Sequence, residues 1–115
     1  MKSILLLSLF LNAGIINSPL QLFNTSLTIT VRDELGNIVE GASVKLYTKE
    51  DDFIKEKNQI QEGATDAKGI VKFKKLEPLS YYILCRKGDK DNTGGGEKIG
   101  ELKKGEFNKV TIVIQ

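Results

Sequence analysis

The segment Asp33–Tyr47 constrains the fold more than any other part of the sequence, because it combines a tight turn with a half-buried strand. Before it, Leu27–Arg32 alternates apolar and polar residues, which is the pattern of a strand with one buried face. Asp33 can accept hydrogen bonds from amides ahead of it, and Gly36-Asn37 tolerates positive φ, so the chain can reverse. A second strand should follow, with Ala42, Val44 and Leu46 facing inward and Ser43, Lys45 and Tyr47 facing the other way.

The same pattern returns in Gly63–Phe73, where Asp66–Gly69 forms the turn and Val71 and Phe73 point inward. Tyr81–Cys85 is almost continuously apolar or aromatic, as expected of a central strand buried on both faces. The chain closes in a β-branched strand at Val110–Ile114, while the polar connection Thr48–Glu62 can hold a short helical turn or an edge strand. These elements predict an all-β fold, a small Greek-key β-sandwich of about seven strands.

The amino terminus predicts where the protein works. Lys2 precedes the apolar run Ile4–Ile16, which matches a secretory signal and is short for a membrane span. We therefore expect residues 1–24 to form a signal peptide and leader, and residues 25–115 to form the sandwich. No small-x-small triplet marks a cleavage site, so an uncleaved signal anchor stays open. The expected location is the periplasm, the cell surface or the medium, with no integral membrane span after signal removal.

Composition excludes several functions. Charged residues make up 28% of the chain, 17 basic and 15 acidic, and the two signs are interspersed, which argues against nucleic-acid binding. The chain has no histidine, and this removes Ser-His-Asp and Cys-His catalysis and imidazole zinc sites. Cys85 is the only cysteine, so no intrachain disulfide can form, and its apolar neighbours favour a buried side chain over a reactive thiol. We expect a protein that is not an enzyme and needs no cofactor.

One loop carries a possible ligand chemistry. Asp89, Asp91 and Thr93 are spaced two apart with Gly94 next, as in the first half of a calcium loop, and Glu97 could contribute. The second half departs from that pattern, because Gly100 stands where a bidentate glutamate is needed. The alternative is a solvated loop between strands.

The segments Asp33–Tyr47 and Gly63–Ile83 resemble the carboxypeptidase regulatory-like and B-type adhesin repeat domains, which are transthyretin-like (prealbumin-like) sandwiches. The resemblance implies a fold and brings no activity with it. Some adhesin repeats join their first and last strands by a lysine-to-asparagine isopeptide bond that a buried acid promotes. Alignment with that motif places Val31 at the lysine and Cys85 at the acid, which leaves Asn108 without partners and disfavours self-crosslinking.

Together these features predict an exported, non-enzymatic module with a binding or structural role at the cell envelope. Its partner would be a protein or glycan, recognised through Thr48–Glu62 or Asp89–Glu97. Two alternatives stay open: a transthyretin-like carrier whose homo-oligomer creates a small-ligand site between subunits, and a calcium-stabilised adhesion domain.

Overall fold

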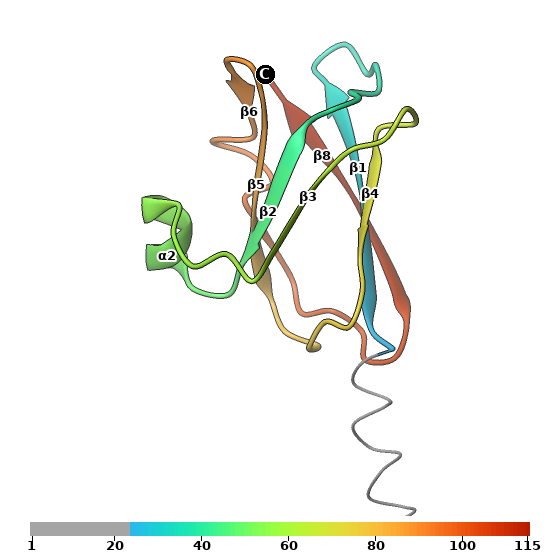
Figure 1. Cartoon of the computed structure of the whole chain (residues 1–115), viewed down its shortest axis with the longest axis vertical. Coiled ribbons are helices and arrows are strands. Elements are labelled where there is room, and N and C mark those ends of the chain that lie inside the picture. The colour runs from blue at the N-terminus through green and yellow to red at the C-terminus, as the bar shows by residue number, and fades with distance from the viewer. Residues whose placement is uncertain (1–23) are drawn as a thin grey trace, which may run out of the picture.

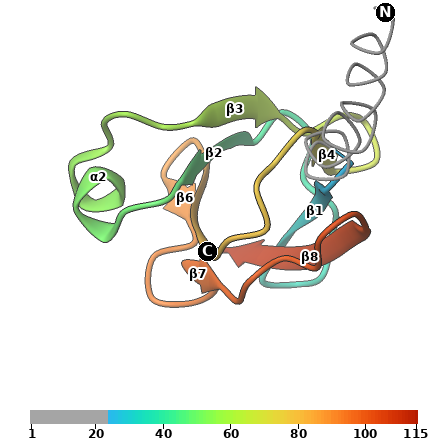
Figure 2. The same cartoon turned by 90° about the horizontal axis from the view of Figure 1, so that it is seen from below.

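The computed structural model describes residues 24–115, which form two β-sheets packed face to face (Figures 1 and 2). Its strands are β1 (Ser26–Asp33), β2 (Ser43–Tyr47), β3 (Gln61–Ala64), β4 (Ile70–Phe73), β5 (Tyr81–Lys87), β6 (Lys90–Asp91), β7 (Lys98–Ile99) and β8 (Phe107–Ile114). The first sheet has the order β4-β1-β8. The second has the order β3-β2-β5-β6, and β7 also pairs with β5. The expected all-β sandwich is confirmed, and two of its eight described strands are only two residues long.

The first and last strands are neighbours in the three-stranded sheet. β8 runs parallel to β1 over its whole length, from Phe107 opposite Ser26 to Ile114 opposite Asp33. On its other side, β1 pairs antiparallel with β4. Because β1 and β8 are parallel, the start of β1 and the end of β8 lie at opposite ends of the sandwich (Figure 1).

Two aspartates form the turns that the sequence predicts. Asp33 Oδ1 accepts hydrogen bonds from the amides of Leu35 at 3.0 Å and Asn37 at 2.9 Å. Asp66 repeats this arrangement with the amides of Lys68 and Ile70. In each turn a glycine has positive φ, +90° at Gly36 and +75° at Gly69, which is a conformation that side chains disfavour. These bonds join residues close in sequence, so the end of β1 and the start of β4 are fixed without a long-range contact.

The core lies between the two sheets, where the inward residues of each strand alternate with exposed ones. The predicted inward residues Ala42, Val44, Leu46 and Phe73 are all buried, and Val71 packs against them. Burial of such aliphatic and aromatic side chains is the main stabilising term in a domain of this size. The core consists of Leu27, Ile29, Val31, Ala42, Val44, Leu46, Phe73, Leu76, Tyr81, Ile83, Cys85, Leu102, Ile112 and Ile114.

The Thr48–Glu62 connection contains both of the elements that the sequence allows. A short helix, α2 (Glu50–Lys55), is followed by the edge strand β3. The helix covers the outer face of the second sheet, where Phe53 packs edge-on against Tyr47 at 5.8 Å and stacks on Tyr82 at 5.6 Å between ring centroids. The expectation that Tyr47 faces away from the core holds, but Tyr47 is fully buried, because α2 covers it.

The expected signal peptide and leader lie outside the described residues, apart from Asn24. Within residues 24–115, no helix has the length and apolarity that a bilayer span requires.

Candidate functional site

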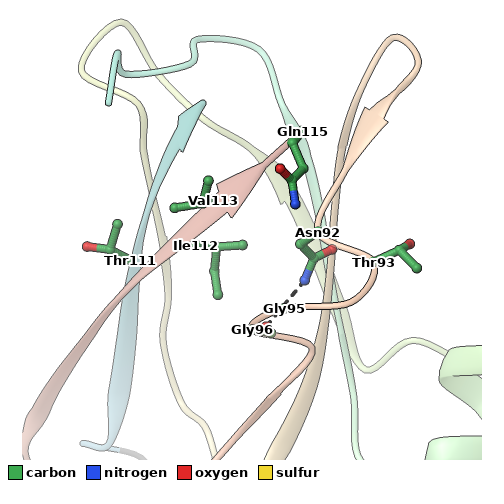
Figure 3. Close-up of a pocket in the computed structure, with 8 residues that line it drawn as sticks. All are labelled: Asn92, Thr93, Gly95, Gly96, Thr111, Ile112, Val113 and Gln115. Atoms are coloured by element: carbon green, nitrogen blue, oxygen red, sulfur yellow. Dashed lines mark hydrogen bonds between the residues drawn. The ribbon is translucent and has the colours of Figure 1, made fainter. Parts of the chain in front are cut away.

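The loop between β6 and β7, residues 92–97, is held against the edge of β5 by a buried asparagine. The side chain of Asn92 accepts a hydrogen bond from the Cys85 amide at 2.9 Å and donates to the Ile83 carbonyl at 2.8 Å. It therefore takes the place of a strand residue between the short pairings that β6 and β7 make with β5. A third bond to the Gly96 carbonyl, at 3.3 Å, ties the loop back on itself (Figure 3). The buried Asn92 side chain thus anchors the loop to β5.

The oxygens predicted as calcium ligands serve the loop's own backbone. Asp91 Oδ1 accepts a hydrogen bond from the Thr93 amide at 3.0 Å, and Glu97 Oε2 accepts one from the Gly94 amide at 2.8 Å. The bond from the Thr93 amide holds the pKa of Asp91 below its usual value. Asp89 precedes β6 in the adjoining exposed turn. In the described part of the chain, no three carboxylate or thiol side chains gather as a metal-binding group.

We expect calcium to leave the thermal stability unchanged, because calcium takes about six to eight oxygen ligands and no three acidic side chains gather within residues 24–115. The melting temperature should be the same in millimolar calcium and in a chelator. The loop would be established as a calcium site if calcium raised the melting temperature of the unchanged chain but not that of the double variant Asp91→Asn and Glu97→Gln. Binding to the folded state alone stabilises that state.

A cavity of about 220 Å³ separates this loop from the last strand (Figure 3). None of the lining side chains is charged, so they offer amide and hydroxyl groups but no acid or base. It is lined by Asn92, Thr93, Gly95, Gly96, Thr111, Ile112, Val113 and Gln115.

The outer edge of β8 is open in the sense that no strand pairs with it within residues 24–115, although loop residues 92–96 and 99–103 border it across cavities. Beyond the strand, Gln115 pairs with Asp91, donating its amide at 3.0 Å and accepting at 3.3 Å, on the side away from β1. Peptide groups alternate direction along a strand, so the amides of Thr111 and Val113 also face away from β1. Within residues 24–115 no strand covers that edge. Open edges of this kind accept a strand from another chain.

The positions that align with an isopeptide motif have other roles. Val31 and Cys85 lie fully buried in the apolar core. Asn108 is opposite Leu27 at the other end of β1, and its amide donates to the carbonyls of Ser26, Lys103 and Glu106 at 3.1–3.2 Å. It closes the turn before β8. Burial raises the pKa of the Cys85 thiol to about 12, which keeps it protonated at neutral pH.

Sequence reasoning missed the buried polar residues that organise the loops. Besides Asn92, Thr65 donates to the Val39 carbonyl at 2.6 Å and accepts from the Ala42 amide, and Thr25 accepts from the Gly105 amide at 2.7 Å. The partners of Thr65 and Thr25 are 23 to 80 residues away along the chain. The only local signal is a polar residue next to a strand, which occurs equally in exposed loops.

Neither a family model nor a curated protein matches the sequence. Solved structures do match. The pilus 2b backbone protein of group B streptococcus has a TM-score of 0.58 and 17% identity over 78% of this chain and 40% of its own. The Bacillus anthracis TIE protein has a TM-score of 0.56 and 23% identity over 77% of this chain and 16% of its own. BcpA, the major pilin subunit of Bacillus cereus, has a TM-score of 0.51 and 19% identity over 79% of this chain and 29% of its own.

The chain thus has the fold of a β-sandwich domain of the kind found in pilus backbone proteins, in agreement with the B-type adhesin repeat resemblance. It spans less than half the length of each of these solved chains.

Proposed function

We propose that this chain is a non-enzymatic structural module of the cell envelope, built to bear tension along its long axis. The observation that carries the proposal is the parallel pairing of β1 with β8 over eight residue pairs. Tension between residues 24 and 115 pulls these adjacent strands in opposite directions along their axes (Figure 1). In this shear geometry all hydrogen bonds of the β1–β8 ladder bear the force at once. If β8 were instead peeled from β1 starting at one end, the bonds would break one after another.

Both ends of β8 are fastened in a way that suits such a role. At its start, Asn108 bonds to three carbonyls around the preceding turn. At its end, the Gln115–Asp91 backbone pair links the three-stranded sheet to β6 of the other sheet. A force on the last strand is therefore passed to both sheets.

The solved structures support a surface location for this module. Two of the proteins that share its fold are a pilus backbone protein and a major pilin subunit. The apolar run near the amino terminus supports export by a Sec-type signal. The partner would be a neighbouring protein or a glycan of the envelope.

Single-molecule pulling tests the proposal. Cysteines introduced at Asn24 and Gln115 load β1 and β8 in shear, while cysteines at Asn24 and Lys104 peel β8 away from the same end. Cys85 is buried and should not compete for the attachment chemistry. We expect a clearly higher unfolding force in the first geometry. Equal forces in the two geometries would contradict a load-bearing role while leaving the fold intact.

The open edge of β8 supports a second candidate function, assembly through strand addition. Strand addition at this edge would extend the first sheet without disturbing the core. In that case Thr111→Pro, which removes an outward amide, should abolish association seen by sedimentation and leave the monomer folded. Association that survives the substitution would exclude the β8 edge.

A further inference from the structure

The outer face of the three-stranded sheet carries a basic cavity near the point where the described chain begins. Its volume is about 260 Å³, and Phe107, at the start of β8, forms one wall. β1 starts, β4 ends and β8 starts at this same end of the sandwich (Figure 1). The cavity is lined by Asn24, Ser26, Lys72, Lys74, Lys75 and Phe107.

Ser26, one of the residues that line this cavity, has a buried hydroxyl without a hydrogen-bond partner. The residue is 4% exposed, and its Oγ is buried without a hydrogen-bond partner. Leu27 next to it points into the core, so Ser26 lies on the opposite, cavity-lining face of β1. A buried hydroxyl without a partner is costly and rare in folded proteins, so this group gains from a hydrogen bond to a bound molecule.

The lysines that line the cavity have no acidic partner in the part of the chain that the structure describes. None of the lining residues is acidic, and the ion pairs found within residues 24–115 do not involve Lys72, Lys74 or Lys75. Lys72 Nζ lies 4.8 Å from the centroid of the Phe107 ring, which is 75% exposed. Lys75 has φ of +58°, a backbone conformation in which glycine is favoured over lysine. Three lysines thus line one cavity without an ion pair to an acidic residue within residues 24–115.

We propose that this cavity binds a phosphate-type oxyanion. The Ser26 hydroxyl donates one hydrogen bond, and the three ammonium groups supply charge-assisted bonds to the remaining oxygens. Phe107 shields one side of the bound group, which strengthens these bonds by limiting access of water. The chemistry is shared by free phosphate and by the phosphodiesters of lipid headgroups and envelope polymers. This site is independent of the mechanical role proposed above.

The test is an amide NMR titration of the full chain, kept in a neutral detergent. The probes are inorganic phosphate and glycerophosphoglycerol, with sodium chloride at matched ionic strength as the control. We expect saturable shifts of the amides of Ser26, Lys74 and Lys75 with phosphate. Saturation by the diester as well identifies a site open to phosphodiesters, and saturation by inorganic phosphate alone identifies a site for the free ion. Equal shifts with chloride would overturn the proposal, since they report only screening.

Two single substitutions separate binding from folding. Ser26→Ala removes the hydroxyl and should weaken phosphate binding about tenfold, the value of one hydrogen bond to a charged group. Its melting temperature should not fall, because the hydroxyl has no partner in the free protein. Lys75→Gly relieves the positive φ and removes a charge, so the melting temperature should hold or rise while binding weakens. Unchanged binding in both variants would overturn the assignment.

A matched pair of triple variants tests the role of the charges. Replacing Lys72, Lys74 and Lys75 by glutamine should abolish saturable binding. Lys49→Gln, Lys57→Gln and Lys68→Gln together remove the same net charge from exposed positions that do not line the cavity, and should leave binding unchanged. Equal losses in the two variants would show that only net charge matters, and the site would be rejected.

Discussion

Replacing Val110 by proline is expected to lower the free energy of unfolding by about 2–3 kcal/mol, since it breaks the β1–β8 ladder at its middle. Val110 lies opposite Ile29. The Ser26 amide donates to the Glu106 carbonyl, which sets the alternation of β8 so that its even-numbered residues face β1. Proline at position 110 therefore removes a ladder donor and leaves a carbonyl of β1 without its partner.

The adjacent position provides the control for this effect. Thr111 belongs to the same strand, but its amide faces the open edge, so Thr111→Pro should cost much less. Urea unfolding of the two variants measures the difference directly from the shift in midpoint. If both prolines destabilise the protein equally, the deduced direction of the peptide groups in β8 is wrong. The Thr111 amide would then not face an unpaired edge.

Substitution of Asn92 by alanine is expected to cost about 2–4 kcal/mol, although the residue lies in a loop. Its side chain is buried and satisfies the Cys85 amide and the Ile83 carbonyl. Removal leaves both groups of β5 buried without partners, and each such loss costs about 1–3 kcal/mol. Asn92→Asp should be as harmful, because a carboxylate can still accept from Cys85 but cannot donate to Ile83.

Thr93→Ala is the matched control, because Thr93 is exposed and adjoins Asn92 in the same loop. Its unfolding midpoint in urea should stay close to that of the unchanged chain. If Asn92→Ala is no more harmful than Thr93→Ala, the loop is held by other contacts, and Asn92 does not act as the continuation of the β5 ladder.

Strands and turns follow from the sequence wherever the signal is local. Asp33 and Asp66 each accept bonds from amides two and four residues ahead, so the turn chemistry could be recognised without any tertiary contact. The inward positions of β2 also follow from alternation alone, since a side-chain period of two assigns every residue to one face.

The candidate site was predictable only in part. The spacing of Asp91 and Thr93 suggested convergent ligands, which stays a prediction, and in the structure Asp91 Oδ1 accepts a hydrogen bond from the Thr93 amide. An aspartate turn and the first half of a calcium loop have the same residue spacing, so the local pattern cannot separate them. The basic cavity was not predictable, because Ser26, Lys72 and Phe107 come from three strands whose register is a property of the sheet.

The sequence by itself determined an all-β chain, the positions of its turns and the absence of histidine-dependent chemistry. The tertiary structure decided that β8 lies parallel to β1 with an open outer edge, and that α2 covers Tyr47. It also decided that a buried hydroxyl without a hydrogen-bond partner belongs to the same cavity lining as three lysines. The physical reason is the sequence distance over which each interaction acts. Turn hydrogen bonds and side-chain alternation act within a few residues, whereas strand order and cavities depend on how the whole core packs.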